Sequence, residues 1–154
     1  MVSRYQLYRE EKENRENLFN FVLEKFPQVK TLVYAINPKG NDSIYDLDIQ
    51  NYYGEGFLME EMDGLQFKIG PKSFFQTNTK QGERLYQITR DFAELTGTQT
   101  VYDLYCGTGS IGIFVSKQAK KIIGVEVIKE AIDDAKVNAS MNNISNILLL
   151  RGAN

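Results

Sequence analysis

The N-terminal part of the chain repeats its apolar residues at the spacing of an α-helix. Within residues 10–26 the apolar positions lie three and four residues apart, at Leu18, Phe19, Val22, Leu23 and Phe26. This periodicity predicts a helix with one buried face. Pro27 ends it, because proline has no backbone N–H to continue the hydrogen-bond pattern.

Shorter apolar runs follow and predict strands. Residues 31–37 are rich in β-forming side chains, and the runs 56–61 and 65–69 flank a turn that contains Asp63-Gly64. An Asp-Gly pair is typical of a tight hairpin, since both positions accept positive φ. The pattern predicts a small antiparallel sheet over residues 30–76, and with the helix it makes residues 1–78 a small α+β segment.

From residue 79 onward, helical and strand patterns alternate. A helix with the apolar stripe Leu85, Ile88, Phe92 and Leu95, capped by Gly97, comes first. Strands are then predicted at 100–105, 121–126 and 147–150, with helices at 110–118 and 129–142. A βαβαβ run of this kind is one half of an α/β, doubly wound, Rossmann-like domain, here residues 79–154. We expect the boundary between the two domains near residue 78.

Composition narrows the function classes. The 154 residues are 42% hydrophobic and 25% charged, which is typical of a globular domain, and no apolar run approaches the roughly 20 residues of a membrane span. The polar N-terminus does not resemble a signal peptide, so we expect a cytoplasmic protein with no membrane partner. With no histidine and one cysteine, a zinc site, a histidine triad and an internal disulfide are excluded, and no metal site is expected. The net charge of -2 argues against a free-standing nucleic-acid binder.

The run 107–112 matches the glycine pattern G-x-G-x-x-G between a predicted strand and a predicted helix. Alone, this pattern suggests a dinucleotide site. Asp103, inside the preceding strand, changes the interpretation, because a carboxylate repels a pyrophosphate but attracts the ammonium and sulfonium of S-adenosyl-L-methionine. Gly107 and Gly109 allow a sharp turn and a close approach of the backbone to this ligand.

Glu126 ends the second predicted strand about 20 residues after the first glycine, where an acidic side chain can accept hydrogen bonds from both ribose hydroxyls. NAD and S-adenosyl-L-methionine both have such hydroxyls. Other roles stay open: a turn without ligand for the glycines, a loop anchor for Asp103, and an exposed strand-end carboxylate for Glu126. Cys106 has no basic neighbour in sequence to form a thiolate, so we expect it to pack or line the site.

Two motifs together resemble the RNA uracil-5-methyltransferases, which modify rRNA and tRNA. One is the loop 103–109, Asp-Leu-Tyr-Cys-Gly-Thr-Gly, and the other is the segment 72–78, Lys-Ser-Phe-Phe-Gln-Thr-Asn. The resemblance extends over nearly the whole chain, and the 23S rRNA branch is the most similar. It implies that Gln76, Tyr105 and Ser110 contact the methyl donor, with Glu126 as the acidic strand end. Members often have asparagine where this chain has Ser110. Asn78 is expected to cap a helix.

The resemblance also implies the chemistry. In the family, a cysteine thiolate adds to C6 of uracil, C5 takes the methyl group, and a base removes the C5 proton. The nucleophile and the base lie beyond the third strand in the family, so no catalytic residue is expected in this chain. We interpret it as an inactive fragment of an enzyme for a uridine in structured RNA, ribosomal more than transfer RNA.

Three alternatives stay open. The parent is a methyltransferase of another substrate class, the chain is a non-catalytic nucleotide-binding module with an NAD-like site, or it is a complete structural or partner-binding protein. For a fragment, the first strand of the parallel sheet becomes an unprotected edge beside uncovered apolar surface, and we expect self-association.

Overall fold

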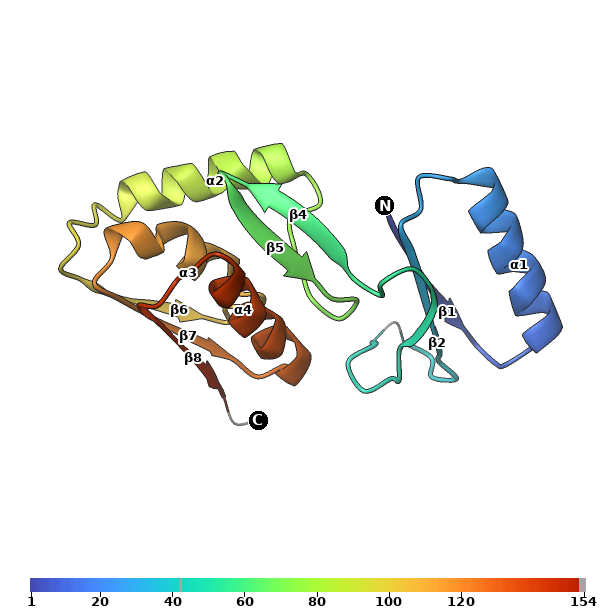
Figure 1. Ribbon diagram of the computed structural model, residues 1–154. Coiled ribbons are helices and arrows are strands. Elements are labelled where there is room, and N and C mark those ends of the chain that lie inside the picture. The colour runs from blue at the N-terminus through green and yellow to red at the C-terminus, as the bar shows by residue number, and fades with distance from the viewer. Residues whose placement is uncertain (42, 153–154) are drawn as a thin grey trace. The chain divides into compact units, whose positions relative to one another are not determined.

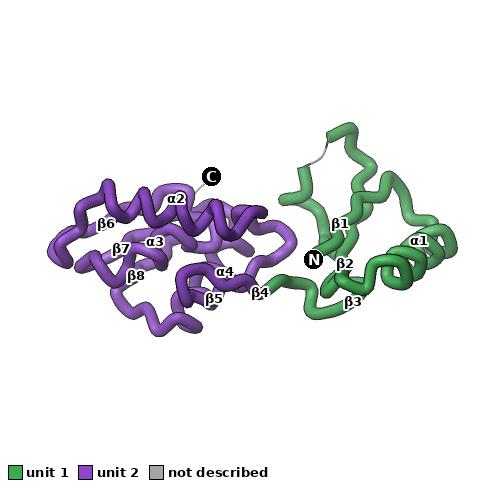
Figure 2. The backbone as a smooth tube through the Cα atoms, turned by 90° about the horizontal axis from the view of Figure 1, so that it is seen from above, with its two compact units in different colours: residues 1–58 green, residues 59–154 purple. Residues whose placement is uncertain are grey.

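A computed structural model describes residues 1–41 and 43–152; Asp42, Ala153 and Asn154 lie outside the described residues. The chain divides into two compact units, Met1–Leu58 and Met59–Asn154 (Figure 2). This division falls before the hairpin that contains Asp63-Gly64, whereas the sequence placed the boundary near residue 78. The reason is that the hairpin packs on helices of the second unit.

Unit 1 is a three-stranded sheet with one helix. Its elements are β1 (Val2–Leu7), α1 (Lys12–Lys25), β2 (Thr31–Ile36) and β3 (Gln50–Tyr53). The strand order is β1-β2-β3, with β1 parallel and β3 antiparallel to β2. The strand β1 was not predicted, because its residues are half-buried or exposed in alternation and none is fully buried. The single antiparallel sheet predicted over residues 30–76 is wrong: residues 31–36 and 50–53 pair antiparallel in a mixed sheet with β1, and the strands at 58–62 and 65–69 form a separate two-stranded sheet.

The core of unit 1 is aromatic. Phe19 of α1 is fully buried and contacts three tyrosine rings, with centroids at 5.3 Å to Tyr5, 5.4 Å to Tyr34 and 4.9 Å to Tyr52. These rings come from all three strands, so one side chain of the helix joins the whole sheet. The predicted helix is confirmed, with Phe19 and Val22 as its buried residues.

Unit 2 begins with a hairpin and a long helix. The hairpin is formed by β4 (Leu58–Met62) and β5 (Leu65–Ile69), and α2 (Thr79–Phe92) follows (Figure 1). Asp63 and Gly64 have φ values of 52° and 73°, so the predicted tight turn is confirmed.

The rest of unit 2 is a parallel α/β layer. In chain order it contains β6 (Thr100–Leu104), α3 (Ser110–Val115), a 3-10 turn η1 (Ser116–Gln118), β7 (Lys121–Glu126), α4 (Lys129–Met141) and β8 (Ile147–Arg151). The strands pair in parallel in the order β6-β7-β8. The predicted α/β fold class, the first half of a Rossmann-like domain, is confirmed.

The face of α2 that is buried is not the face that the apolar stripe predicted. Leu85, Ile88 and Phe92 are 51%, 41% and 85% exposed, and the buried residues are Gly82 and Tyr86. Gly82 faces the hairpin closely: a Cβ there would lie 3.3 Å from the Met62 side chain. The helix also ends at Phe92 rather than at a cap formed by Gly97, so the element was predicted correctly but its buried face and its end were not.

One face of the parallel sheet carries no helix among the described residues. Helices α3 and α4 cover one face (Figure 1), and Ile122 of β7 is fully buried, whereas the other face presents exposed apolar side chains. On this face, residues of the three strands lie side by side in two rows: Tyr102, Ile123 and Leu148 form one row, and Leu104, Val125 and Leu150 form the other. Tyr102 and Leu104 are 66% and 62% exposed. We call these six residues the open sheet face.

Side chains of α4 hydrogen-bond the outer edge of β5. Asn142 accepts from the Gln66 amide at 2.9 Å and donates to its carbonyl at 2.7 Å. One turn earlier, Asn138 accepts from the Lys68 amide at 2.7 Å and donates to its carbonyl at 3.1 Å. One turn earlier again, Asp134 accepts from the Gly70 amide at 3.0 Å. The helix thus takes the place of a neighbouring strand, and we call this set the amide ladder.

In the part of the chain that the structure describes, no helix combines the length and the apolar composition that crossing a membrane requires.

Candidate functional site

The loop after β6 concentrates unusual backbone geometry. Within five residues, Tyr105, Gly107 and Gly109 have φ values of 63°, 54° and 75°. For a residue with a side chain this left-handed conformation costs roughly 1–2 kcal/mol, so Tyr105 is held there by its surroundings. Strain of this kind gathers at ligand-binding sites, and the loop is the first candidate in the molecule.

The two glycines of the loop serve different needs. A Cβ on Gly107 would meet nothing within 4 Å, so only its φ requires glycine, and the space beside it is open. A Cβ on Gly109 would lie 3.2 Å from the Ala135 Cβ of α4. Gly109 therefore lets the loop pack on α4, while Gly107 leaves its backbone accessible to a ligand.

Glu126 is buried at the end of β7 and holds the loop. Its Oε2 accepts from the Gly107 amide at 3.0 Å, and its Oε1 accepts from the Val127 and Ile128 amides at 2.7 and 2.9 Å. Residue 126 is only 8% exposed. Its position beside Gly107 agrees with the predicted acidic strand end, and Oε2 accepts one bond while a carboxylate oxygen can accept two.

Asp103 lies inside β6 and anchors the start of α3. Its Oδ2 accepts from the Gly112 amide at 2.9 Å. Burial raises the pKa of Asp103 above its ordinary value, and the Gly112 hydrogen bond opposes that rise only in part. The loop-anchor role that the sequence left open is thus present, together with a desolvated carboxylate that favours a nearby positive charge.

Tyr105 and Cys106 lie next to each other but differ in accessibility. Tyr105 is 85% exposed, so its ring is free to contact a ligand. Cys106 is buried, and burial, with the charges of Asp103 and Glu126, raises its pKa to about 12. A thiol with this pKa stays protonated at neutral pH, in agreement with the packing role expected for it.

Ser110 points into the core. Its hydroxyl lies 2.9 Å from the Tyr86 hydroxyl, and residue 110 is 8% exposed. This bond connects the first residue of α3 to α2. The residue was predicted to line the cofactor pocket, but the structure gives it a partner inside the protein.

Gln76 is carried by a different segment, residues 70–78, between β5 and α2. It is half-buried and packs on α2, where a Cβ on Gly82 would lie 2.8 Å from the Gln76 Cβ. Asn78 accepts from the Gln81 amide at 3.2 Å and caps α2, as the sequence indicated. Tyr105, Gly107, Gly109 and Glu126 therefore form one group, and Gln76 belongs to a second segment of the same unit.

Sequence reasoning missed the residues behind the loop. Asn138 of α4 is fully buried and donates to the Thr108 carbonyl at 3.1 Å, in addition to its bonds with β5. Thr108 is also buried, and its Oγ1 has no hydrogen-bond partner among the described residues. The sequence feature that could have indicated these contacts is the polar residues at positions 134, 138 and 142, which are spaced at one helical turn on a single face of the helix.

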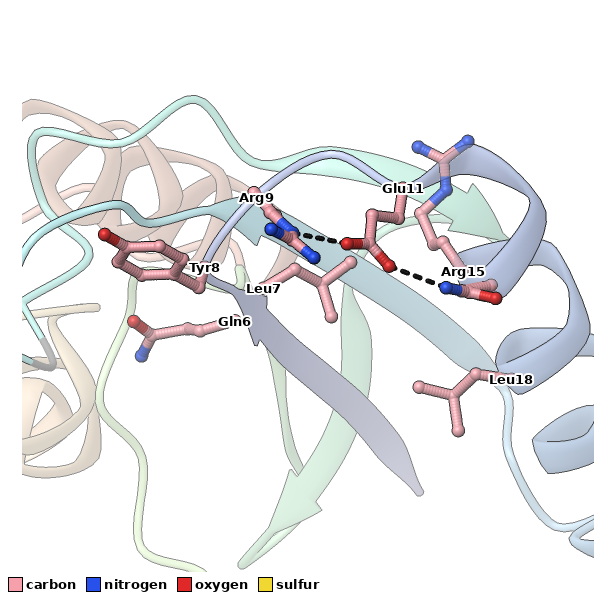
Figure 3. Close-up of a pocket in the computed structure, with 8 residues that line it drawn as sticks. Gln6, Leu7, Tyr8, Arg9, Glu11, Arg15 and Leu18 are labelled. Carbon is pink, nitrogen blue, oxygen red and sulfur yellow. Dashed lines mark hydrogen bonds and ion pairs between the residues drawn. The ribbon is translucent and has the colours of Figure 1, made fainter.

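A hollow lies in unit 1, at the junction of β1 and α1 (Figure 3). Its cavity volume is about 320 Å³, and the lining residues are Gln6, Leu7, Tyr8, Arg9, Glu11, Asn14, Arg15 and Leu18. The cations there already have anionic partners: Arg9 pairs with Glu11, and Arg15 pairs with Glu10 at 2.8 Å and with Glu16 at 3.1 Å. With its charges neutralised, this hollow is a weaker candidate than the glycine loop.

Comparison with known proteins identifies relatives of the whole chain. The sequence profile of the tRNA (Uracil-5-)-methyltransferase family matches residues 12–154. A protein of Bacteroides thetaiotaomicron described as an uncharacterized RNA methyltransferase is 53% identical over 137 residues, which is 89% of this chain and 30% of that protein. One of Porphyromonas gingivalis with the same description is 50% identical over 94% of this chain and 31% of that protein.

A solved structure is similar in fold and sequence. The tRNA (uracil-54, C5)-methyltransferase of Pyrococcus abyssi, in complex with S-adenosyl-L-homocysteine, superposes with a TM-score of 0.68 at 26% identity. The match covers 85% of this chain and 32% of that protein. The chain thus spans about 30% of the length of the curated relatives it matches.

Proposed function

Because the chain belongs to the tRNA (uracil-5-)-methyltransferase family, we propose that it is a fragment of an enzyme that transfers a methyl group to C5 of a uridine in RNA. Its curated relatives are named RNA methyltransferases, which supports the coarser class. The predicted dependence on S-adenosyl-L-methionine is confirmed for the family, since the Pyrococcus abyssi relative holds S-adenosyl-L-homocysteine.

The glycine loop carries the proposal for this chain. The loop lies between two carboxylates, Asp103 in β6 and Glu126 at the end of β7, and its cysteine is neutral. A buried carboxylate, Glu126, and a half-buried one, Asp103, disfavour the pyrophosphate of a dinucleotide and favour the sulfonium and ammonium of S-adenosyl-L-methionine. This charge pattern disfavours an NAD-like site.

The residues of the loop suit the parts of the methyl donor. Gly107 presents backbone without a side chain, Glu126 keeps acceptor capacity for a ribose hydroxyl, and the exposed ring of Tyr105 supplies a flat apolar surface. The bound donor supplies an electrophilic methyl group on sulfur. Gln76, Asp103 and Ser110 remain proposed contacts; the Ser110 hydroxyl bonds Tyr86 and keeps capacity for a second hydrogen bond.

We do not expect this chain alone to methylate uracil. The family route needs a cysteine thiolate, and the single cysteine of the sequence is Cys106, which is buried with a pKa of about 12. The nucleophile and the base are proposed to lie in a part of the longer relatives that this chain does not span. The chain should therefore bind the donor without transferring its methyl group.

The proposed substrate is a uridine in structured ribosomal RNA, and the proposed location is the cytoplasm. The support is the likeness of the loop 103–109 and the segment 72–78 to the ribosomal branch of the family. Transfer RNA is the alternative, since the Pyrococcus abyssi relative is a tRNA enzyme. Radiolabelled methyl transfer by a full-length close relative to purified rRNA and tRNA separates them. Label in a protein or small molecule instead would indicate another substrate class.

Titration calorimetry with S-adenosyl-L-methionine tests the proposed site. Tyr105→Ala is the variant, because its ring is 85% exposed and its removal leaves the core intact; Tyr8→Ala, 73% exposed in unit 1, is the matched control. We expect Tyr105→Ala to lose about tenfold in affinity, as for a stacking contact of 1–3 kcal/mol, and Tyr8→Ala to bind like the wild type. Binding of NAD in place of the methyl donor would overturn the proposal.

We further propose that the chain self-associates through the open sheet face. Tyr102, Leu104, Leu148 and Leu150 are 41–66% exposed on this face, and β6 is the sheet edge beside it among the described strands. Exposed apolar surface beside an unpaired edge favours association. Light scattering should show a mass that rises with concentration, and the double variant Leu104→Glu/Leu150→Glu should abolish the rise. A control, Leu18→Glu in unit 1, should not.

A further inference from the structure

The amide ladder contains two residues that do more than hold the hairpin. Asn142, Asn138 and Asp134 all bond the edge of β5 or the residue after it. Of the three, Asn138 also bonds the glycine loop, at the Thr108 carbonyl. Asp134 also bonds the segment 70–78 at a second residue, the Ser73 hydroxyl. These two residues connect the two parts of the proposed cofactor site through a single helix.

Asn138 uses every polar atom of its side chain. Its Oδ1 accepts from the Lys68 amide at 2.7 Å, and its Nδ2 donates to the Lys68 and Thr108 carbonyls, both at 3.1 Å. The side chain is fully buried, where a polar group without partners is costly. Thr108 lies between the left-handed residues Gly107 and Gly109, so the bond from Asn138 to its carbonyl holds the centre of the loop to α4.

Asp134 fixes the start of the segment that carries Gln76. Its Oδ2 accepts from the Gly70 amide and from the Ser73 hydroxyl, each at 3.0 Å, and its Oδ1 lies 3.1 Å from the Lys68 ammonium. The Asp134 side chain is 10% exposed. A second ion pair one turn earlier, Lys72 with Glu130 at 3.0 Å, holds the same segment to α4.

Packing alone does not require this arrangement. An apolar contact between α4 and β5 tolerates sliding, whereas three directed bonds from one amide fix the distance and the angle. The hairpin already has the Asn142 pair and the apolar core around Phe67 to hold it. The bonds to Thr108 and Ser73 add nothing to that docking, since neither residue is in the hairpin.

We infer that Asn138 and Asp134 are positioning residues of the cofactor site: they hold the glycine loop and the segment 70–78 at a fixed separation. The inference rests on the proposed function, because the separation matters for a ligand that contacts both segments. Neither residue is proposed to touch the ligand. Their effect passes through the Thr108 carbonyl and the Ser73 hydroxyl.

Hydrogen exchange of the full chain tests the connection without any ligand. In Asn138→Ala, exchange of the Gly107 and Gly112 amides should rise about tenfold or more, together with that of Lys68, because the loop loses its bond to α4. In the matched control Asn142→Ala, exchange should rise at Gln66 and stay unchanged in the loop. Equal loop protection in the Asn138 variant and the wild type would overturn the inference.

Binding of S-adenosyl-L-homocysteine tests the consequence. Ser73→Ala removes one half-buried hydroxyl and keeps the fold even if Asn138→Ala does not. It should weaken the ligand about two- to tenfold, the effect of one hydrogen bond, with a thermal midpoint no lower than that of Asn142→Ala. Asn142→Ala should bind like the wild type. Wild-type affinity in both Ser73→Ala and Asn138→Ala would overturn the inference.

The two readouts separate this inference from the proposed function. If the wild-type chain does not bind S-adenosyl-L-homocysteine, the proposed function loses its support in this chain. The exchange rates of Gly107 and Gly112 still decide whether Asn138 holds the loop.

Discussion

The two units differ in how many buried polar side chains and how many residues with strained backbone they contain. Unit 1 is built around the aromatic cluster of Phe19, and within its described residues every residue with positive φ is a glycine, at Gly54 and Gly56. Unit 2 contains all four described non-glycine residues with positive φ, Tyr105 among them, and most of the buried polar side chains. Departures from locally favourable geometry are common at ligand-binding sites, so the comparison supports the proposed site in unit 2.

Among the variants that test this difference between the units, the largest loss of stability should come from a change in the core of unit 1. Phe19→Ala removes a fully buried ring with three aromatic neighbours, and a change of this kind costs about 3–5 kcal/mol of unfolding free energy. Chemical denaturation followed by tyrosine fluorescence should show unit 1 losing its structure first. Cofactor affinity should not change, and a loss of affinity would mean that the units do not divide structure from function as proposed.

A pair of glycines should separate backbone strain from ligand contact. Gly107 and Gly64 have φ values of 54° and 73°, and a Cβ on either would meet nothing within 4 Å. Alanine at either position should therefore cost about 1–2 kcal/mol of unfolding free energy from backbone strain alone. Only Gly107→Ala should also weaken S-adenosyl-L-methionine in calorimetry. Equal affinities in the two variants would remove Gly107 from the site.

A smaller effect, with a pH signature, should come from Asp103→Asn. Burial raises the pKa of Asp103 in the folded chain, so the folded state binds this proton more tightly than the unfolded state. The wild type should then lose stability as pH rises from the ordinary aspartate pKa of about 3.9 to the raised folded pKa. Asparagine can still accept from the Gly112 amide and does not titrate. Urea unfolding between about pH 3.5 and 7 should show the variant gaining stability relative to the wild type.

The same variant should weaken the positively charged methyl donor. A gain in stability combined with a loss of affinity would mark Asp103 as a residue kept for binding. If affinity stays unchanged, Asp103 is a loop anchor only.

The smallest effect should come from Thr108→Val. The Thr108 hydroxyl is buried without a partner among the described residues, and valine has nearly the same shape. Removing an unsatisfied hydroxyl should leave the unfolding free energy unchanged or raise it by up to about 1 kcal/mol. A clear loss in thermal denaturation would reveal an unrecognised partner of this hydroxyl.

The sequence predicted those elements whose signals are local. The Asp63-Gly64 turn, the Asn78 cap and the alternating strands and helices after residue 100 each depend on a few neighbouring residues. The buried face of α2 could not be predicted, because Leu85 and Phe92 form an apolar stripe while the hairpin selects the face with Gly82. The pairing of β1 with β2 was missed for the same reason, since it depends on contacts across about 30 residues of sequence.

The site shows the same limit. The glycine pattern and the two acidic positions were visible, because each is defined by its distance in sequence from the loop. The bond of the Ser110 hydroxyl to Tyr86, 24 residues earlier, was not predicted, and the contact of Ser110 with the methyl donor stays a prediction. The contacts of Asn138 were not predicted, since its partner residues Thr108 and Lys68 lie 30 and 70 residues away in sequence.

The amide ladder also limits how long β5 can be. Four helical residues advance about 6.0 Å along a helix axis, whereas two residues of an antiparallel strand advance about 6.8 Å. Each rung therefore falls about 0.8 Å further out of step, so a fourth rung would be out of step by about 2.4 Å, more than a good hydrogen bond tolerates. A helix can match a strand for about this length only. The ladder has three rungs, at Gln66, Lys68 and Gly70, and β5 ends at Ile69. The end of β5 beside the last rung agrees with this mismatch of pitch, and the segment that carries Gln76 begins there.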